Sequence, residues 1–267
     1  MINYEIKEGV AVVTLARPER LNALIPEMSR ALAPHFETAA RDDRVRSVLL
    51  QAEGRAFCAD GDVGRIANDP PYVNREVMKL SHRMIRNLAA IEKPVVASLR
   101  GSVAGIGWSL ALACDIIIAS ETARFAQVFR NIGLVPDGGA VWFLTQYVGT
   151  LKAKELVFSG RRIDANEAME LGLVTRVVTD TSLTQRVGRP HWTSFRAPRE
   201  PSARARRSSN SCTSPPSRRC WRGRRCCSRL LWKAKTTGRA FVPFSRSGHR
   251  NSSAPDAPIF FTFRRQP

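Results

Sequence analysis

Apolar runs of strand length alternate with segments of helical spacing over roughly the first 180 residues. Val45–Ala52, Val95–Leu99 and Asp115–Ala119 are rich in β-branched residues, which predicts buried strands. Tyr72–Ile91 places apolar residues three or four positions apart, as an amphipathic helix does. Strands that alternate with helices favour an α/β fold with mainly parallel strand pairing.

The remaining segments extend this pattern. Ile2–Lys7 and Val10–Leu15 flank Glu8-Gly9 and predict a β-hairpin. Pro26 is well placed to open a helix that reaches about Ala40. Further helices are expected at Gly105–Ala113, Ala140–Val148, Lys152–Ser159 and Asn166–Leu171, and a last strand at Val174–Val178.

The pattern and the charge both change near Leu183, which predicts two regions, 1–183 and 184–267. Residues 1–183 hold 22 Lys and Arg against 21 Asp and Glu, whereas residues 184–267 hold 20 against two. The net charge of +19 therefore belongs almost entirely to the second region. That region is rich in Arg, Ser and Pro without helical or strand periodicity, so we expect it to be disordered or non-native.

Several classes of protein are disfavoured by the composition. No apolar run is long enough to cross a membrane, and the first residues, MINYEIKEGV, do not resemble a signal peptide. The two cysteines of the first region, Cys58 and Cys114, predict a reduced, cytoplasmic protein in which both are small core residues. No cysteine and histidine spacing predicts a metal site.

Four motifs occur in a fixed order along the first region. They are RPERLNAL from Arg17, AFCADGDV from Ala56, GSVAGIG from Gly101, and IGLVPDGG from Ile132. Each motif alone is weak, and a glycine-rich stretch such as the third is also typical of a plain tight turn before a helix. Together, over about 165 residues, they resemble the enoyl-CoA hydratase/isomerase (crotonase) family.

The resemblance implies a fold, an assembly and a site. The fold is a spiral of ββα turns, and the assembly is a homotrimer or a hexamer. The substrate is an acyl-CoA thioester, so CoA is part of the substrate and no separate cofactor is implied. The backbone N–H groups of Gly61 and Ile106 would stabilise the enolate oxygen. The substrate-binding residues would be Ala59, Asp60, Gly61, Asp62, Val63 and Ile106.

Two departures from the family pattern bear on the reaction. The two glutamates that hydratases use would fall at Ser109 and Phe129, and neither residue can act as a general acid or base. Simple hydration is therefore disfavoured. Asp60 replaces the usual glycine of the second motif, where it would either constrain the loop or place a negative charge near the bound CoA.

One acid remains in a suitable position. Asp137 matches the aspartate that some isomerases of the family use to move a proton between carbons of the acyl chain. The alternative is that Asp137 caps a helix that starts near Gly138. The surrounding IGLVPDGG segment most resembles the ring-epoxide phenylacetyl-CoA isomerase branch, which belongs to phenylacetate degradation. Asp62 has an alternative role of its own, which is to hold the loop of the second motif in place.

A change of reading frame would explain the second region. Codons can be chosen for Arg219–Gly248 so that the frame two bases on ends in DYREGVRAFLEKR, which is typical of the family's C-terminal end. We therefore hypothesise a one-nucleotide insertion or deletion between about Thr179 and Arg196. In that case residues 184–267 replace the family's trimerisation helices.

Three hypotheses for function follow. The first is an acyl-CoA isomerase that uses Gly61, Ile106 and Asp137. The second is an enoyl-CoA hydratase with weak or absent hydration. The third is an inactive family member, or a nonspecific nucleic-acid binder through its basic second region. No motif predicts specific nucleic-acid binding or membrane attachment.

Overall fold

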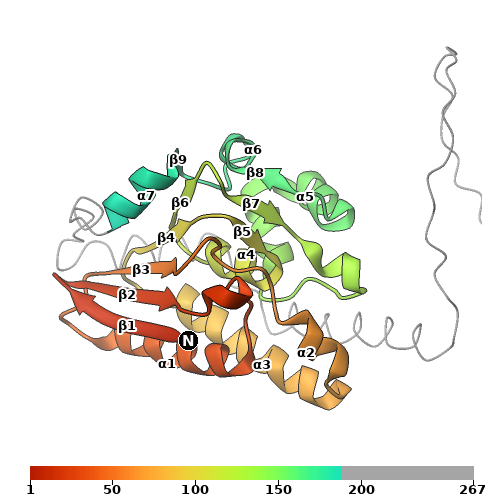
Figure 1. The fold of residues 1–267 in the computed structure, drawn as a ribbon, viewed down its shortest axis with the longest axis horizontal. Helices are drawn as coiled ribbons and strands as arrows, with labels where there is room; N and C mark the ends of the chain where they lie inside the picture. The colour runs from red at the N-terminus through yellow and green to blue at the C-terminus, as the bar shows by residue number, and fades with distance from the viewer. Residues whose placement is uncertain (188–267) are drawn as a thin grey trace, which may run out of the picture.

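Two sheets organise residues 1–187, which are the part of the chain that this computed structural model describes (Figure 1). The larger sheet has the strand order β1-β2-β3-β4-β6-β9, and the smaller has the order β5-β7-β8. In the described part, β1 with β2 and β7 with β8 are antiparallel, and all other ladders are parallel. The strands are Ile2–Lys7 (β1), Val10–Leu15 (β2), Ser47–Ala52 (β3), Val95–Leu99 (β4), Ser102–Ala104 (β5), Ile116–Ser120 (β6), Arg124–Ala126 (β7), Ile163–Asp164 (β8) and Arg176–Val178 (β9).

Helices connect and cover these strands, so the predicted α/β class is confirmed. The predicted hairpin and parallel pairing are present, whereas the short strands β5, β7 and β8 were not predicted. Strands of two or three residues are too short for an alternating pattern to show. The helices are Pro26–Arg41 (α1), Val63–Asn68 (α2), Pro71–Ala89 (α3), Gly105–Leu112 (α4), Ala140–Ser159 (α5), Ala165–Glu170 (α6) and Asp180–Val187 (α7), with 3-10 turns at Pro18–Arg20 (η1) and Val128–Ile132 (η2).

The six-stranded sheet separates two apolar layers. Inward-facing residues of β2, such as Val13, join the main core with α1 and α3, which lie side by side (Figure 1). Residues on the other face, such as Val12, pack with Leu183 of α7 in a smaller cluster. Helix α7 thus runs across the predicted boundary at Leu183 and ends at Val187. The rest of the predicted second region lies outside the described residues.

Helix α5 contains a break at Gly149, whose φ of 72° and ψ of 169° are not helical. The break divides the helix as predicted, into segments on either side of Gly149. Several large apolar side chains of α5 remain exposed, including Leu151 at 85% and Phe158 at 69%.

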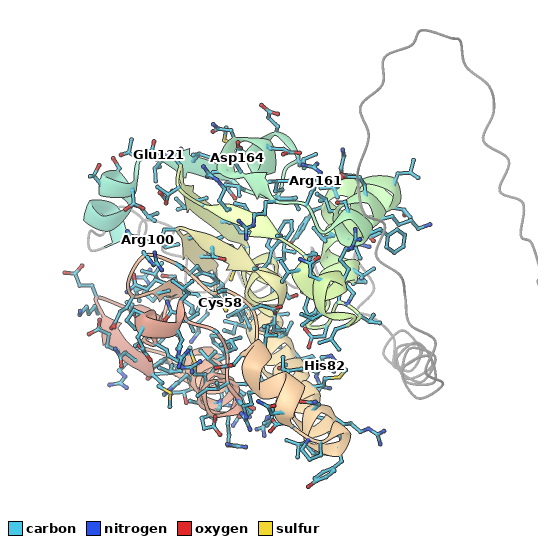
Figure 2. The ribbon with its side chains drawn as sticks, turned by 45° about the vertical axis from the view of Figure 1, so that its right-hand side comes forward. Cys58, His82, Arg100, Glu121, Arg161 and Asp164 are labelled. Atoms are coloured by element: carbon cyan, nitrogen blue, oxygen red, sulfur yellow. The ribbon has the colours of Figure 1, made fainter. Side chains whose placement is uncertain are left out.

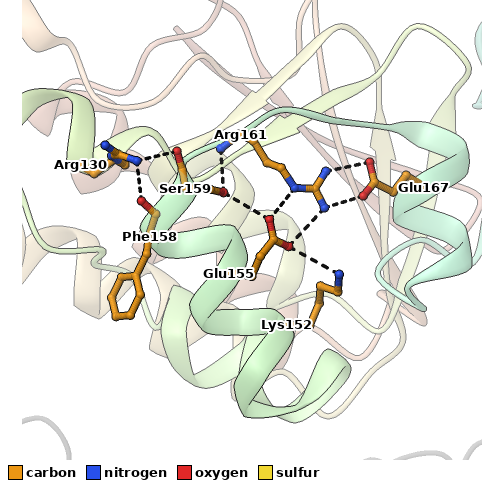
Figure 3. A network of polar contacts seen from close by, with 7 residues as sticks. All are labelled: Arg130, Lys152, Glu155, Phe158, Ser159, Arg161 and Glu167. Carbon is orange, nitrogen blue, oxygen red and sulfur yellow. Dashed lines mark hydrogen bonds and ion pairs between the residues drawn. The ribbon is translucent and has the colours of Figure 1, made fainter. Parts of the chain in front are cut away.

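The end of α5 is fixed by two arginines (Figure 3). Arg161 donates from Nε and Nη2 to Glu155 of α5 at 2.6 and 3.2 Å, and from both Nη atoms to Glu167 of α6 at 2.6 and 3.0 Å. Arg130 of η2 donates to the carbonyl oxygens of Phe158 and Ser159 at 2.6 and 2.9 Å. Bidentate arginine contacts of this kind specify geometry. They hold η2, α5 and α6 together, and the segment between η2 and α5 contains Asp137.

Asn22 joins the first motif to the loop that precedes the second. Its side chain is fully buried. The Nδ2 group donates to the carbonyl oxygens of Glu53 and Ala56 at 2.9 and 2.8 Å, and Oδ1 accepts from the N–H of Arg17 at 2.8 Å. With φ at 55°, Asn22 is in the left-handed region that asparagine tolerates better than most residues. This explains structurally why an asparagine occupies the motif.

We predict that Asn22→Ala lowers the free energy of unfolding by about 2–4 kcal/mol, because three backbone groups, one of them in a buried hydrogen bond and two in part-buried ones, lose their partner. The matched control is Asn3→Ala, which removes an exposed amide that reaches Glu53 on the surface. We expect the control to stay within about 0.5 kcal/mol of the wild type. Urea denaturation of both variants measures the difference, and equal values would contradict the role given to Asn22.

Candidate functional site

The loop of the second motif is held between two distant parts of the chain. Cys58 forms a parallel bridge with Val103 of β5, and Gly61 forms one with Leu24. The N–H of Cys58 donates to the carbonyl oxygen of Ser102 at 3.0 Å, and the N–H of Ala104 donates to that of Cys58 at 2.9 Å. The loop is therefore paired with β5. Because α4 follows β5 directly, the loop lies beside the start of α4.

Close packing brings α4 against this loop. A Cβ atom on Gly107 would lie 2.5 Å from Cβ of Cys58, so only glycine fits without a shift. All eight residues of α4 are buried. Gly105, at the start of the helix, has φ at 50°, which glycine adopts freely. The close contact places the first N–H groups of α4 directly beside the loop.

Cys58 lies in the interior between these elements (Figure 2). Burial raises the pKa of its thiol to about 12, so the thiol stays protonated at neutral pH. Cys114 is also buried. Both cysteines are thus small core residues, as predicted.

Asp60 points its side chain inward at the junction of loop and helix. The residue is 3% exposed, and its Oδ1 accepts a hydrogen bond from the N–H of Ile106 at 2.9 Å. The N–H of the next residue, Gly61, lies near enough to this carboxyl group to lower its pKa. Of the two N–H groups predicted to stabilise an enolate oxygen, that of Ile106 therefore already donates to the Asp60 carboxyl group. The sequence raised the possibility of a charge near the CoA but did not reveal this contact.

Burial and hydrogen bonding act on the pKa of Asp60 in opposite directions. Burial raises the pKa of the carboxyl group above its ordinary value, while the hydrogen bonds from Ile106 and Gly61 act in the opposite direction. The backbone is also unusual, because φ of Asp60 is 103°, in a region that favours glycine. Asp60 thus combines a buried acid with a backbone conformation that costs about 1–3 kcal/mol.

Asp137 lies on the turn that packs against the same helix. A Cβ atom on Gly138 would lie 2.4 Å from Cδ1 of Ile106 and 2.9 Å from Cβ of Ser109. The Ser109 hydroxyl donates to the carbonyl oxygens of Gly105 and Asp137 at 3.2 and 3.1 Å. Ser109, which occupies one of the two positions where hydratases of the family have a glutamate, therefore ties the Asp137 turn to α4. The sequence did not show this role. Helix α5 begins at Ala140 with Gly139 as its N-cap, so the capping role of Asp137 stays a prediction.

Asp62 and Val63 sit further along the loop, at the start of α2. Asp62 accepts from Nη2 of Arg17 at 3.0 Å and from the N–H of Arg65 at 3.4 Å, which makes it the N-cap of α2. Val63 is 42% exposed. Ala59 is held by its N–H, which donates to the carbonyl oxygen of Leu21 at 3.1 Å. The contacts of Asp62 support its alternative role in holding the loop, and substrate contact by Ala59 and Val63 stays a prediction.

The other position where hydratases have a glutamate also lacks an acid in this chain. Phe129, on η2, is 4% exposed and belongs to the main core. Within residues 1–187, no group of three or more His, Cys, Asp or Glu side chains could hold a metal ion. No helix in that part of the chain is long and apolar enough to cross a membrane.

We predict that Gly105→Ala is more destabilising than Gly133→Ala. Both glycines have positive φ, at 50° and 67°. An added Cβ at Gly105 would lie 2.0 Å from Oδ1 of Asp60, whereas nothing lies within 4 Å at Gly133. Gly133→Ala, the control, should lower the free energy of unfolding by about 1–2 kcal/mol. Gly105→Ala should lower it by at least about 1 kcal/mol more.

The double variant Asp60→Gly, Gly105→Ala separates the contact from the backbone strain. If Asp60 causes the clash, the second substitution costs less in the Asp60→Gly background, where it approaches the cost of Gly133→Ala. Thermal and urea denaturation of the full cycle give this coupling. Additive effects would show that the Asp60 side chain does not lie over Gly105.

We predict that the wild type loses stability relative to Asp60→Asn as the pH rises above 3.8, the ordinary pKa of this group. The raised pKa means that the folded state binds this proton more tightly than the unfolded state does. The contribution is therefore fully present below the ordinary pKa and is lost as the pH rises through the raised value. Urea denaturation across this range should show the change, and a wild type that gains stability over Asp60→Asn would contradict it.

Comparison with known proteins places this chain in a family. The enoyl-CoA hydratase/isomerase family model matches residues 5–192. The 1,2-epoxyphenylacetyl-CoA isomerase of Escherichia coli (strain K12) is 38% identical over 182 residues, which are 67% of this chain and 70% of that protein. The trans-2-decenoyl-(acyl-carrier-protein) isomerase of Streptococcus mutans is 34% identical over 74% of this chain and 80% of that protein.

Among solved structures, the crystal structure of an enoyl-CoA hydratase from Mycobacterium avium subsp. paratuberculosis K-10 is similar with a TM-score of 0.79. It is 31% identical in sequence, and the match covers 87% of this chain and 93% of that one. The spiral fold expected from the four motifs is therefore confirmed. The chain belongs to the enoyl-CoA hydratase/isomerase, or crotonase, family.

Proposed function

We propose that this chain is an acyl-CoA isomerase that stabilises a thioester enolate. The observation that carries the proposal is that the Ile106 N–H donates at 2.9 Å to a carboxyl group that also lies beside the N–H of Gly61. Two backbone donors aimed at one oxygen form an oxyanion hole, which stabilises negative charge as it develops on a thioester oxygen. Because Ile106 lies in the first turn of the buried helix α4, the positive end of the helix dipole adds to this effect.

In the proposed mechanism Asp137 moves a proton. Its carboxylate removes a proton from C2 of the acyl group, and the electron pair of the C–H bond moves onto the thioester oxygen as an enolate. Asp137 then returns the proton to C4, while the double bond moves from between C3 and C4 to between C2 and C3. The proton and the charge are thus balanced, and no cofactor is consumed. The position of the Asp137 turn against Ile106 and Ser109 supports this role.

Hydration is the less favoured function. Adding water to an enoyl thioester requires an acid or base to activate the water. Ser109 is fully buried and its hydroxyl donates to two carbonyl oxygens, and Phe129 has no ionisable group. Product analysis with crotonyl-CoA distinguishes the two functions, because hydration would yield a hydroxyacyl-CoA.

The acyl group in this proposal carries a ring, as in phenylacetate degradation. Support comes from the 38% identity with 1,2-epoxyphenylacetyl-CoA isomerase. Trp142 and Phe143 also pack edge to face beside the Asp137 turn, with ring centroids 5.0 Å apart. We also propose that the protein is cytoplasmic and forms a homotrimer or a hexamer. Such an assembly would cover exposed apolar residues such as Leu151. Light scattering measures the assembly.

We predict that Asp137→Asn slows exchange of the C2 protons of phenylacetyl-CoA for deuterium by about 10²-fold or more, because the proton acceptor is lost. Proton NMR in D₂O follows the exchange without requiring a completed isomerisation. Glu170→Gln is the control, since Glu170 is an exposed acid of α6. Exchange that persists in Asp137→Asn at the control's rate would remove Asp137 from the mechanism.

A further inference from the structure

Asp60 is a buried ionisable group that the proposed reaction does not use. It nonetheless accepts a hydrogen bond from one proposed oxyanion donor, Ile106, and lies beside the other, Gly61. We infer that the Asp60 carboxylate is a built-in occupant of the oxyanion hole, which the thioester oxygen must displace before enolate chemistry can begin. The effect of Asp60 on the reaction rests on the proposed function, whereas the contact between Asp60 and the Ile106 N–H can be tested separately.

The first support is that the Asp60 carboxyl group occupies one of the donors directly. The N–H of Ile106 donates to Oδ1 at 2.9 Å. A backbone N–H has one hydrogen to donate. While this bond exists, the Ile106 donor is not available to a substrate oxygen, and the carboxyl group also lies beside the N–H of Gly61.

The second support is that the surrounding backbone directs this side chain inward. The N–H of Leu24 donates to the carbonyl oxygen of Asp60 at 2.8 Å, and the Cys58 thiol approaches the same oxygen at 3.6 Å. With the backbone held at a φ of 103°, the side chain lies over Gly105, where all three of the nearest atoms to an added Cβ belong to the Asp60 carboxyl group. The absence of a Cβ on Gly105 is what leaves room for the carboxyl group.

The consequence follows from charge. A carboxylate forms stronger hydrogen bonds with backbone N–H groups than a neutral thioester carbonyl does. The neutral substrate therefore competes poorly for the hole. Even when the acyl group is bound nearby, a carboxylate at this position opposes the developing negative charge of the enolate. Asp60 thus suppresses the reaction that the rest of the site is arranged to perform.

Other ionisable groups belong to the elements around Asp60. Cys58 lies on the same loop and its thiol is neutral at ordinary pH. Asp62 follows two residues later and is paired with Arg17 at 3.0 Å, and that hydrogen bond lowers its pKa. Asp137 lies on the turn that packs against Ile106. A measurement of Asp60 must therefore distinguish it from these three groups.

The contact can be observed directly in the full-length protein. Gly105-Ile106 is the only glycine–isoleucine pair in the sequence, so labelling glycine carbonyls with ¹³C and isoleucine nitrogens with ¹⁵N isolates the Ile106 N–H in a carbonyl-filtered NMR spectrum. We expect its resonance to shift with pH as Asp60 titrates. The shift should disappear in Asp60→Asn and persist in Asp62→Asn. A resonance that does not titrate in the wild type, or still titrates in Asp60→Asn, overturns the inference whatever the activity.

The functional consequence is tested with Asp60→Gly, which frees the Ile106 donor and suits the positive φ. We expect exchange of the C2 protons of phenylacetyl-CoA to accelerate by about ten- to hundredfold, the range expected for removing a charge-assisted hydrogen bond. Glu8→Gly is the matched control, because Glu8 is an exposed acid with φ at 49° in the β1–β2 turn. The control should leave both the exchange rate and the Ile106 resonance unchanged.

The outcomes separate the inference from the function on which it rests. Titration of Ile106 together with faster exchange in Asp60→Gly supports both. Slower exchange in Asp60→Gly overturns the inference, because Asp60 would then assist the reaction. Titration of Ile106 without exchange by either the wild type or Asp60→Gly overturns the proposed function and leaves the Asp60 contact standing.

Discussion

The parallel bridge between Cys58 and Val103 is the interaction on which the site depends. It aligns the end of one loop with the start of α4, so that two backbone N–H groups far apart in sequence point at one place. Gly107 makes the alignment possible, since a side chain there would meet Cys58. Asn22 holds the loop from its other side. The site is therefore built from backbone geometry, and its side chains serve mainly to fix that geometry.

Much of the fold could be predicted because the chain repeats a simple physical pattern. Buried parallel strands such as Val95–Leu99 appear as apolar runs, and α3 has clear helical spacing. The strands β5, β7 and β8 escaped prediction because hydrogen bonding to neighbouring segments, rather than local sequence, makes them strands. The break in α5 was predictable because Gly149 interrupts an otherwise continuous apolar pattern. Local sequence therefore predicts the large elements, whereas the small strands require knowledge of their neighbours.

The candidate site was only partly predictable for the same reason. The motifs indicated Gly61, Ile106 and Asp137 by their resemblance to a family, and the structure brings the segments that carry them together. The roles of Ser109 and Asp60 depend on which backbone groups lie within a few ångströms, at positions distant in sequence. One signal was present in the sequence, because an aspartate stands where the motif has glycine. What the sequence could not show is the direction in which that side chain points.

Asp60 concentrates two costs at one residue, a buried acid and a backbone conformation that favours glycine. The hydrogen bond from Ile106 offsets part of the first cost, and this donor is one of the two that the proposed oxyanion hole would use. An oxyanion hole needs donors that are free for the substrate oxygen. In this chain the protein itself provides an acceptor for the Ile106 N–H. The same preorganisation that would stabilise an enolate therefore stabilises a carboxylate in its place.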